Sequence, residues 1–104
     1  MNKLEHGAPI NATATHATAA VASVAGAAGK THYITNVAAS SDKSGSIMLV
    51  KQGTTTLWQV QVGVGSFSQA FSPALAAVSG ALVSVEIDGT SACKANINGF
   101  TLQP

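Results

Sequence analysis

The amino-acid sequence predicts an all-β fold, a single antiparallel β-sandwich of about seven or eight strands with jelly-roll connectivity. The chain of 104 residues is long enough for one hydrophobic core. Hydrophobic residues make up 46% and charged residues 9% of the sequence, a balance opposite to that of a disordered chain. Short β-branched and aromatic runs recur with turn residues between them, as in sandwiches and barrels. We expect the sandwich over residues 13–104, after an extended arm over residues 1–12.

The expected arm has little periodicity, and Pro9 restricts the backbone around it to extended conformations. Leu4 and Ile10 are its isolated apolar side chains. An extended segment of this length reaches roughly 35–40 Å at about 3.3 Å per residue, enough to pair with the edge of a neighbouring sheet. We therefore hypothesise that Leu4, Pro9 and Ile10 contact a partner subunit. The alternative is a disordered terminus without a role.

The segment from Ala17 to Ala28 is rich in alanine and valine, and two structures compete for it. Alanine favours a helix, whereas the interleaved Thr, Ser, Val and Gly residues weaken that preference and favour a strand. The strand is our expectation. The segment is too short to span a bilayer, so we expect no membrane association.

Alternation of apolar and polar residues predicts the next strands. In residues 31–38 we expect Thr31, Tyr33, Thr35 and Val37 on one face and His32, Ile34 and Asn36 on the other. Residues 46–51 and 55–64 form a predicted hairpin around Gln52 and Gly53, whose second arm places Trp58, Val60, Val62 and Val64 on one face.

Three further segments complete the predicted sandwich. Phe67 and Phe71 belong to a strand that Pro73 closes, because proline cannot donate to a ladder. Residues 81–87 place Val83, Val85 and Ile87 inward. Asp88 and Gly89 then form a tight turn, and residues 92–102 return as the last strand.

The sequence offers little chemistry for catalysis or metal binding. His6, His16 and His32 lack the spacing that places two imidazoles on one metal ion. Glu86 and Asp88 would share one face of a strand, which suits a cation or an acid–base pair, but a solvated face entering a turn explains them more simply. The single cysteine, Cys93, is expected to be a buried strand residue. We predict no catalytic residue, no metal and no cofactor, and therefore no enzyme.

The net charge of the chain limits the classes of partner that we expect it to bind. The net charge is +1, and the sequence contains no arginine. Such a chain lacks the electrostatic footprint that binds phosphate backbones, so we expect no nucleic-acid partner. Trp58 has two interpretations, a platform for sugar stacking or a core residue, and its phase with Val60 and Val62 favours the core.

Several short segments, taken in order, resemble a known class of proteins. They are Gly29-Lys30-Thr31-His32-Tyr33-Ile34-Thr35, Thr56-Leu57-Trp58, Phe71-Ser72-Pro73-Ala74-Leu75, Ala81-Leu82-Val83-Ser84-Val85 and Asn98-Gly99-Phe100-Thr101. This order resembles the small all-β virion proteins of tailed bacteriophages, found as head decoration (cement) or minor capsid proteins. The similarity covers about residues 12–102.

The resemblance implies a structural role on the outer surface of the capsid. Such proteins commonly form trimeric sandwiches that cover junctions between major capsid subunits. The implied partners are the major capsid protein and other copies of this chain, and no catalytic residue is carried over. On this view Leu4, Pro9 and Ile10 are candidate capsid or subunit contacts. We expect the trimer to be held by small and hydroxyl residues, because so few charged residues cannot build many ion pairs.

Two alternative functions remain open. A tail or receptor-binding sandwich would recognise host glycans through the loops at residues 40–46 and 88–91, although both loops are short. A carbohydrate-binding module would need several exposed aromatic side chains, and only 5% of the residues are aromatic.

Overall fold

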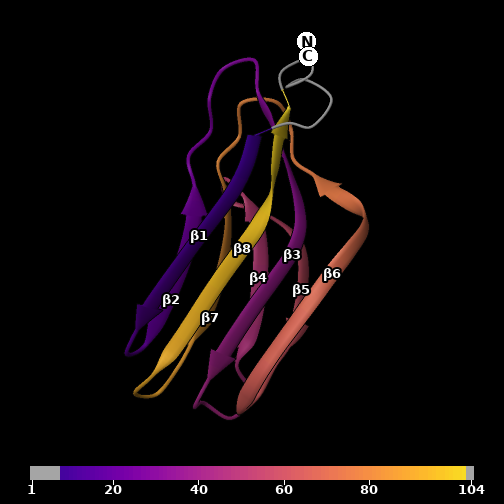
Figure 1. The fold of residues 1–104 in the computed structure, drawn as a ribbon. Coiled ribbons are helices and arrows are strands. Elements are labelled where there is room, and N and C mark those ends of the chain that lie inside the picture. The colour runs from indigo at the N-terminus through magenta and orange to yellow at the C-terminus, as the bar shows by residue number, and fades with distance from the viewer. Residues whose placement is uncertain (1–7, 103–104) are drawn as a thin grey trace.

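The computed structural model describes residues 8–102, which form eight β-strands (Figure 1). The strands are β1 (Ala8–His16), β2 (Ala19–Val24), β3 (Thr31–Ser41), β4 (Ile47–Gln52), β5 (Thr55–Gln61), β6 (Gly65–Ala76), β7 (Val83–Asp88) and β8 (Cys93–Leu102). Within this part of the chain there is no helix long and apolar enough to cross a membrane.

The strands form two packed antiparallel sheets of four strands each (Figure 1). Sheet A has the order β1-β8-β3-β6, and sheet B has the order β2-β7-β4-β5. The first strand pairs with the last, the second with the seventh, the third with the sixth and the fourth with the fifth. This nested pairing is that of a long antiparallel hairpin rolled into two sheets, the jelly roll. The predicted all-β sandwich with jelly-roll connectivity is confirmed.

The core lies between the two sheets and consists of the inward residues of the inner strands. Ile34, Val37, Met48, Val50, Val83, Val85 and Ile97 are fully buried. The predicted inward face of β7 is confirmed, because Val83, Val85 and Ile87 are all buried. The alternation predicted for this segment therefore accounts for three of the seven buried hydrophobic residues on the strands of sheet B.

The alanine-rich segment forms a strand, as expected. In β2, Ala20 and Ala22 are buried, whereas Val21 between them is 48% exposed. This period of two belongs to a half-buried strand, and β2 pairs with β7 along its whole length. Pairing of β2 with β7 therefore outweighs the intrinsic preference of alanine for a helix.

The sandwich begins earlier than predicted. Strand β1 starts at Ala8 and pairs with β8 from Ala8–Thr101 to His16–Cys93, so residues 8–12 are part of sheet A and not of a free arm. Ile10 packs against the core of its own domain, which explains this pairing, and Pro9 is exposed at the start of an edge strand, where proline is tolerated. Leu4 lies outside the described residues, as do the other residues of the range 1–7.

A β-bulge changes the predicted faces of β3. The register of β3 against both β6 and β8 shifts between Ile34 and Asn36, so Thr35 is the additional residue. As a result Ile34 and Val37 both point into the core, and the prediction that Val37 shares a face with Tyr33 is wrong.

Pro73 does not end β6, which continues to Ala76. Pairing with β3 stops after Ala70 and resumes at Leu75, so Pro73 lies in a stretch that leaves the ladder. Because β6 is an edge strand, this stretch has no second neighbour that needs a donor.

The two long sides of the sandwich differ. On one side, β1 and β2 are joined by a tight turn and lie against each other, which closes the core (Figure 1). On the other side, β5 and β6 are the edge strands, and their backbones do not come together in the same way along the described chain. Side chains alone cover the core on this side.

Gly99 offers a test of the bulged register. A Cβ added at Gly99 would lie 1.9 Å from the carbonyl oxygen of Tyr33, because β3 approaches β8 closely beside the bulge. We expect Gly99→Ala to lower the free energy of unfolding by about 1–3 kcal/mol or more in denaturant titration. Ser68→Ala, an exposed change on the neighbouring strand β6, should stay within about 0.5 kcal/mol of wild type. Equal stability of the two variants would contradict the close approach.

Candidate functional site

The outer face of sheet B carries an exposed apolar patch. Val21 on β2 is 48% exposed and Ile47 on β4 is 44% exposed, and Leu49, two residues further along β4, is partly buried. Val21, Glu86 and Leu49 form one row across β2, β7 and β4. Together they line a shallow groove of about 280 Å³. We call Val21, Ile47 and Leu49 the sheet B patch.

The carboxylates of two ion pairs lie on β7, between the β2 and β4 members of the sheet B patch. Glu86 and Asp88 point to the same face of β7, as predicted, but each carboxylate has its own lysine. Lys51 Nζ lies 3.2 Å from Glu86 Oε2, and Lys43 Nζ lies 2.7 Å from Asp88 Oδ2. The hydrogen bond from Lys43 holds the pKa of Asp88 below its usual value. The lysines thus occupy the positions that a shared cation would need, and within residues 8–102 no three His, Cys, Asp or Glu side chains gather.

One end of the sandwich is closed by a polar clamp centred on Asp42. Its carboxylate accepts backbone N–H groups of Thr90 at 2.8 Å and of Ser91 at 3.0 Å, and it also accepts the hydroxyl of Ser91. These bonds hold the pKa of Asp42 well below its usual value. The two predicted recognition loops, at residues 40–46 and 88–91, are therefore brought together and fixed to each other. The carboxylate is already used by this internal contact.

The histidines and the cysteine of the described chain have structural contacts. His16 Nδ1 accepts the backbone N–H groups of Thr18 and Ala19 and so stabilises the turn between β1 and β2. His32 is buried, with Nε2 2.8 Å from the carbonyl oxygen of Ala25 and Nδ1 2.6 Å from the hydroxyl oxygen of Thr101. Cys93 is a buried strand residue, as predicted. His6 lies outside the described residues.

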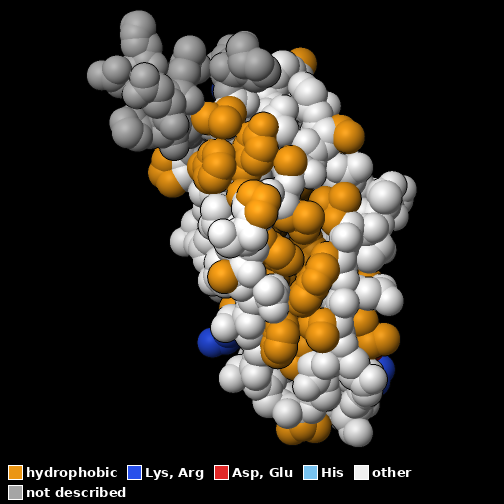
Figure 2. Space-filling view, turned by 90° about the vertical axis from the view of Figure 1, so that its right-hand side faces the viewer, with side chains coloured by type: hydrophobic (Ala, Val, Ile, Leu, Met, Phe, Trp, Pro, Cys, Tyr) orange, Lys and Arg blue, Asp and Glu red, His pale blue; other side chains and the backbone are white. Residues whose placement is uncertain are grey.

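The open side of the sandwich exposes a continuous line of hydrophobic side chains (Figure 2). Trp58 from β5 meets Phe71 from β6 edge to face at 5.3 Å, and its ring centre lies 6.5 Å from that of Phe67. These partly buried rings bridge the gap between the two edge strands. We call the partly buried hydrophobic side chains of this side the seam; its members are Trp58, Val60, Val62, Phe67, Phe71 and Leu75.

The two interpretations of Trp58 can now be compared. Trp58 packs against the core, as the favoured interpretation states, but it does so at the margin of the sandwich and not at its centre. Val64, which was predicted to share its face, is 69% exposed because it lies beyond the end of β5.

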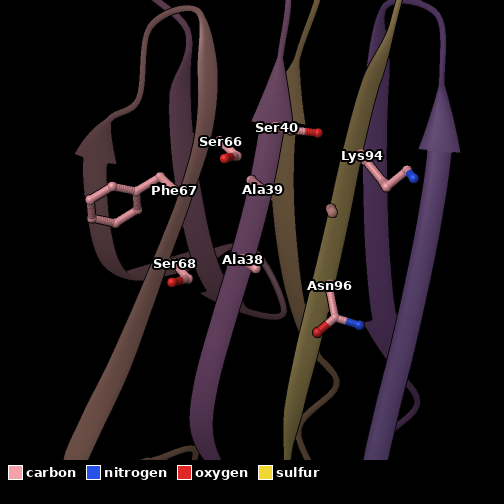
Figure 3. Close-up of a pocket in the computed structure, with 9 residues that line it drawn as sticks. Ala38, Ala39, Ser40, Ser66, Phe67, Ser68, Lys94 and Asn96 are labelled. Atoms are coloured by element: carbon pink, nitrogen blue, oxygen red, sulfur yellow. The ribbon is translucent and has the colours of Figure 1, made fainter.

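Sheet A has a shallow groove of about 380 Å³ on its outer face (Figure 3). Its lining includes the small residues Ala38, Ser40, Ser66 and Ser68, and Lys94 is its only charged side chain. The amide nitrogen of Asn96 donates to Asn11, Ala12 and Thr13, so this side chain is held toward β1. Phe67 points away from the groove in Figure 3, toward the seam. The groove offers small hydroxyl and methyl groups and no pair of a nucleophile and a base.

Further along the same face, two aromatic rings lie side by side. Tyr33 and Phe100 are cross-strand neighbours with ring centres 5.0 Å apart and an angle of 11° between the ring planes. The next row across the sheet contains Asn11, Asn98 and Asn36. This is the surface of the described chain that most resembles a sugar-binding face, because amides and aromatic rings are neighbours there.

Neither the sheet B patch nor the seam was predicted from the amino-acid sequence. Of the two predicted contact residues within the described range, Ile10 packs inward and Pro9 is exposed. A signal for the patch was present, since Val21 and Ile47 occupy outward positions of alternating strands. The seam needs knowledge of which strands lie at the edges, and alternation alone does not provide it.

The clamp predicts a pH dependence of stability. Because the pKa of Asp42 is lowered from 3.8 in the folded state, the ionised carboxylate stabilises the fold above about pH 4, and this contribution is lost as the pH falls toward the folded-state pKa. We expect Asp42→Asn to lower the melting temperature at pH 7 and the difference from wild type to shrink below about pH 4. Thermal unfolding followed by circular dichroism measures it. A difference that stays constant down to pH 2 would count against the clamp.

Comparison with known proteins adds one partial likeness of shape. No protein-family model and no curated protein matches the chain. Among solved structures, PliG of Aeromonas hydrophila, a periplasmic lysozyme inhibitor of g-type lysozyme, is similar over 91% of this chain and 89% of that chain, with a TM-score of 0.39 and 8% sequence identity. A likeness at this level supports no statement about function.

Proposed function

We propose that this chain is a structural protein of a bacteriophage virion, a head decoration protein that binds the major capsid protein on the outer surface and stabilises the lattice. The sequence resemblance motivates the proposal. The observation that carries it in the structure is the sheet B patch, where Val21 and Ile47 are exposed on one face of the sheet together with the partly buried Leu49. Large apolar side chains exposed on one face of a small domain commonly mark a site of interaction with another protein.

The arrangement around the patch supports a protein partner. Val21 on β2 and Ile47 and Leu49 on β4 lie on either side of the carboxylates of β7, and these carboxylates, Glu86 and Asp88, are each paired with a lysine. Apolar side chains provide burial at a protein–protein interface, and the charges between them provide specificity. The contact with the capsid is thereby proposed for sheet B, in place of the contact that the sequence suggested for Ile10.

The use of the titratable groups supports a binding role without catalysis. In the described chain, Asp42, Glu86 and Asp88 each have a hydrogen-bonding or ion-pairing partner, and His32 has two. A general base or nucleophile needs a side chain that can exchange a proton with a substrate. The proposal therefore includes no catalytic residue, metal or cofactor.

Carbohydrate binding is the second candidate, and one observation favours it. The Tyr33–Phe100 pair adjoins the asparagine row of sheet A, and aromatic faces with amide donors are suitable for sugars. A glycan screen of the free chain separates the candidates. Binding of a sugar that Tyr33→Ala abolishes, with no binding to phage particles, would favour a carbohydrate-binding or receptor-binding protein.

The decisive experiment is binding to particles. Purified chain is mixed with phage heads assembled without it, and its copy number relative to the major capsid protein is measured after sedimentation of the heads. We expect near-stoichiometric occupancy. Ile47→Asp places a charge in the apolar patch, and it should weaken binding at least about tenfold, equivalent to about 1.4 kcal/mol.

Val78→Asp is the matched control, because Val78 is 60% exposed and lies near the opposite end of β4, where its backbone N–H binds Gln52. It should bind as wild type does. Absence of wild-type binding, or equal binding by the Ile47 and Val78 variants, would refute the assignment of the patch.

A further inference from the structure

The seam is a surface feature that neither the sheet B patch nor the polar clamp involves. It follows the open side of a molecule that is 46 Å long (Figure 2). Trp58, Phe67 and Phe71 fill it, and Val64 at the connection between β5 and β6 is 69% exposed. Aromatic side chains are enriched at the centres of protein interfaces.

The strands that border the seam are unprotected edges. Val62 donates its backbone N–H to Ser46 at 2.8 Å, so by alternation the N–H groups of Gln61 and Gln59 point away from β4. Natural edge strands are usually blocked by charged side chains or by a covering segment. Strand β5 contains no charged residue, and within the described residues no strand pairs with its free edge.

The distribution of charge indicates what kind of partner covers this side. No Lys, Arg, Asp, Glu or His residue lies between Lys51 and Glu86, a stretch that includes all of β5 and β6. In Figure 2 lysine side chains lie only at the margins of the coloured surface. A partner of different sequence would be recognised by complementary charges, and this side provides none.

An interface between copies of the same chain, in contrast, favours a surface that has no charged residues near the symmetry axis. Around a rotation axis each residue near the axis meets its own equivalents, so a charge there would face a like charge. Like charges placed opposite each other destabilise such contacts. An uncharged side with aromatic side chains at its centre meets this requirement.

We propose that the seam is the interface between copies of this chain, and that in the assembled homo-oligomer the symmetry axis runs along β5 and β6. The neighbouring copies then cover Trp58, Phe67 and Phe71 and complete the burial that the jelly roll leaves unfinished on this side. The trimer expected from the sequence resemblance is one assembly with such an axis. The interface uses a different side from the sheet B patch, which stays available for the capsid.

A matched pair of lysine substitutions tests the interface. Gln69 on β6 lies on the same face as Phe67 and Phe71, and Ser23 on β2 is an exposed polar residue on the opposite side of the sandwich. Each is replaced with Lys, and self-association of the free chain is measured by sedimentation equilibrium. We expect Gln69→Lys to raise the dissociation constant of the assembly at least about tenfold and Ser23→Lys to leave it within about twofold of wild type.

Salt dependence separates repulsion at the axis from a folding defect. Assembly of wild type should be the same at low and high salt, because the contact is apolar. High salt should partly restore assembly of Gln69→Lys, because it screens the introduced charges. Unchanged circular dichroism and melting temperature of the monomer confirm that the variant folds.

Two results would overturn the proposal. One is a wild-type chain that remains monomeric at concentrations of hundreds of micromolar, and the other is a Gln69→Lys variant that assembles as wild type does. The experiment uses the free chain without particles, so its failure and a failure of capsid binding are separate results.

Discussion

The structure depends on how the two sheets meet at the sides of the sandwich, because backbone contact between strands closes the core on one side only. Nested antiparallel pairing brings β1 and β2 together and seals the core between them, whereas β5 and β6 end the two sheets on the other side without meeting. Edge-to-face packing of Trp58 on Phe71 is the contact that covers the core there. Because the fully buried residues are valine, isoleucine and methionine of modest size, the aromatic rings at the open side provide much of the remaining apolar burial.

As a result of this asymmetry, the regions of the surface differ in the contacts that they can make with a partner. The Asp42 clamp and the His16 turn fix one end of the sandwich by hydrogen bonds that use their polar atoms internally. The outer face of sheet B has two ion-paired carboxylates between apolar side chains, and the outer face of sheet A carries hydroxyl, amide and methyl groups and the Tyr33–Phe100 pair. The seam lies on the open side between the two sheets, so a lattice contact through sheet B and self-association through the seam are compatible on one molecule.

Much of the fold could be predicted from alternation, because period-two burial is local information. It placed Val83, Val85 and Ile87 inward and identified the hairpin of β4 and β5. The bulge at Thr35 could not be predicted, since the register shift arises where β3 meets both β6 and β8. The pairing of residues 8–12 was missed for a similar reason, because an edge strand with proline near its start has the composition of an arm. At the candidate site, the common face of Glu86 and Asp88 followed from spacing, but their lysine partners come from elsewhere in the chain.

The central claim is that the open side of the sandwich is covered by other copies of the chain, and Trp58, the single tryptophan, reports on it directly. Acrylamide quenching of tryptophan fluorescence should be compared between dilute and concentrated wild type and in the Gln69→Lys variant. The account predicts that quenching of wild type decreases and its emission shifts to shorter wavelength as the chain assembles, while the variant keeps the accessibility of dilute wild type. Quenching of wild type that stays the same while sedimentation shows assembly would place the interface elsewhere and contradict the account.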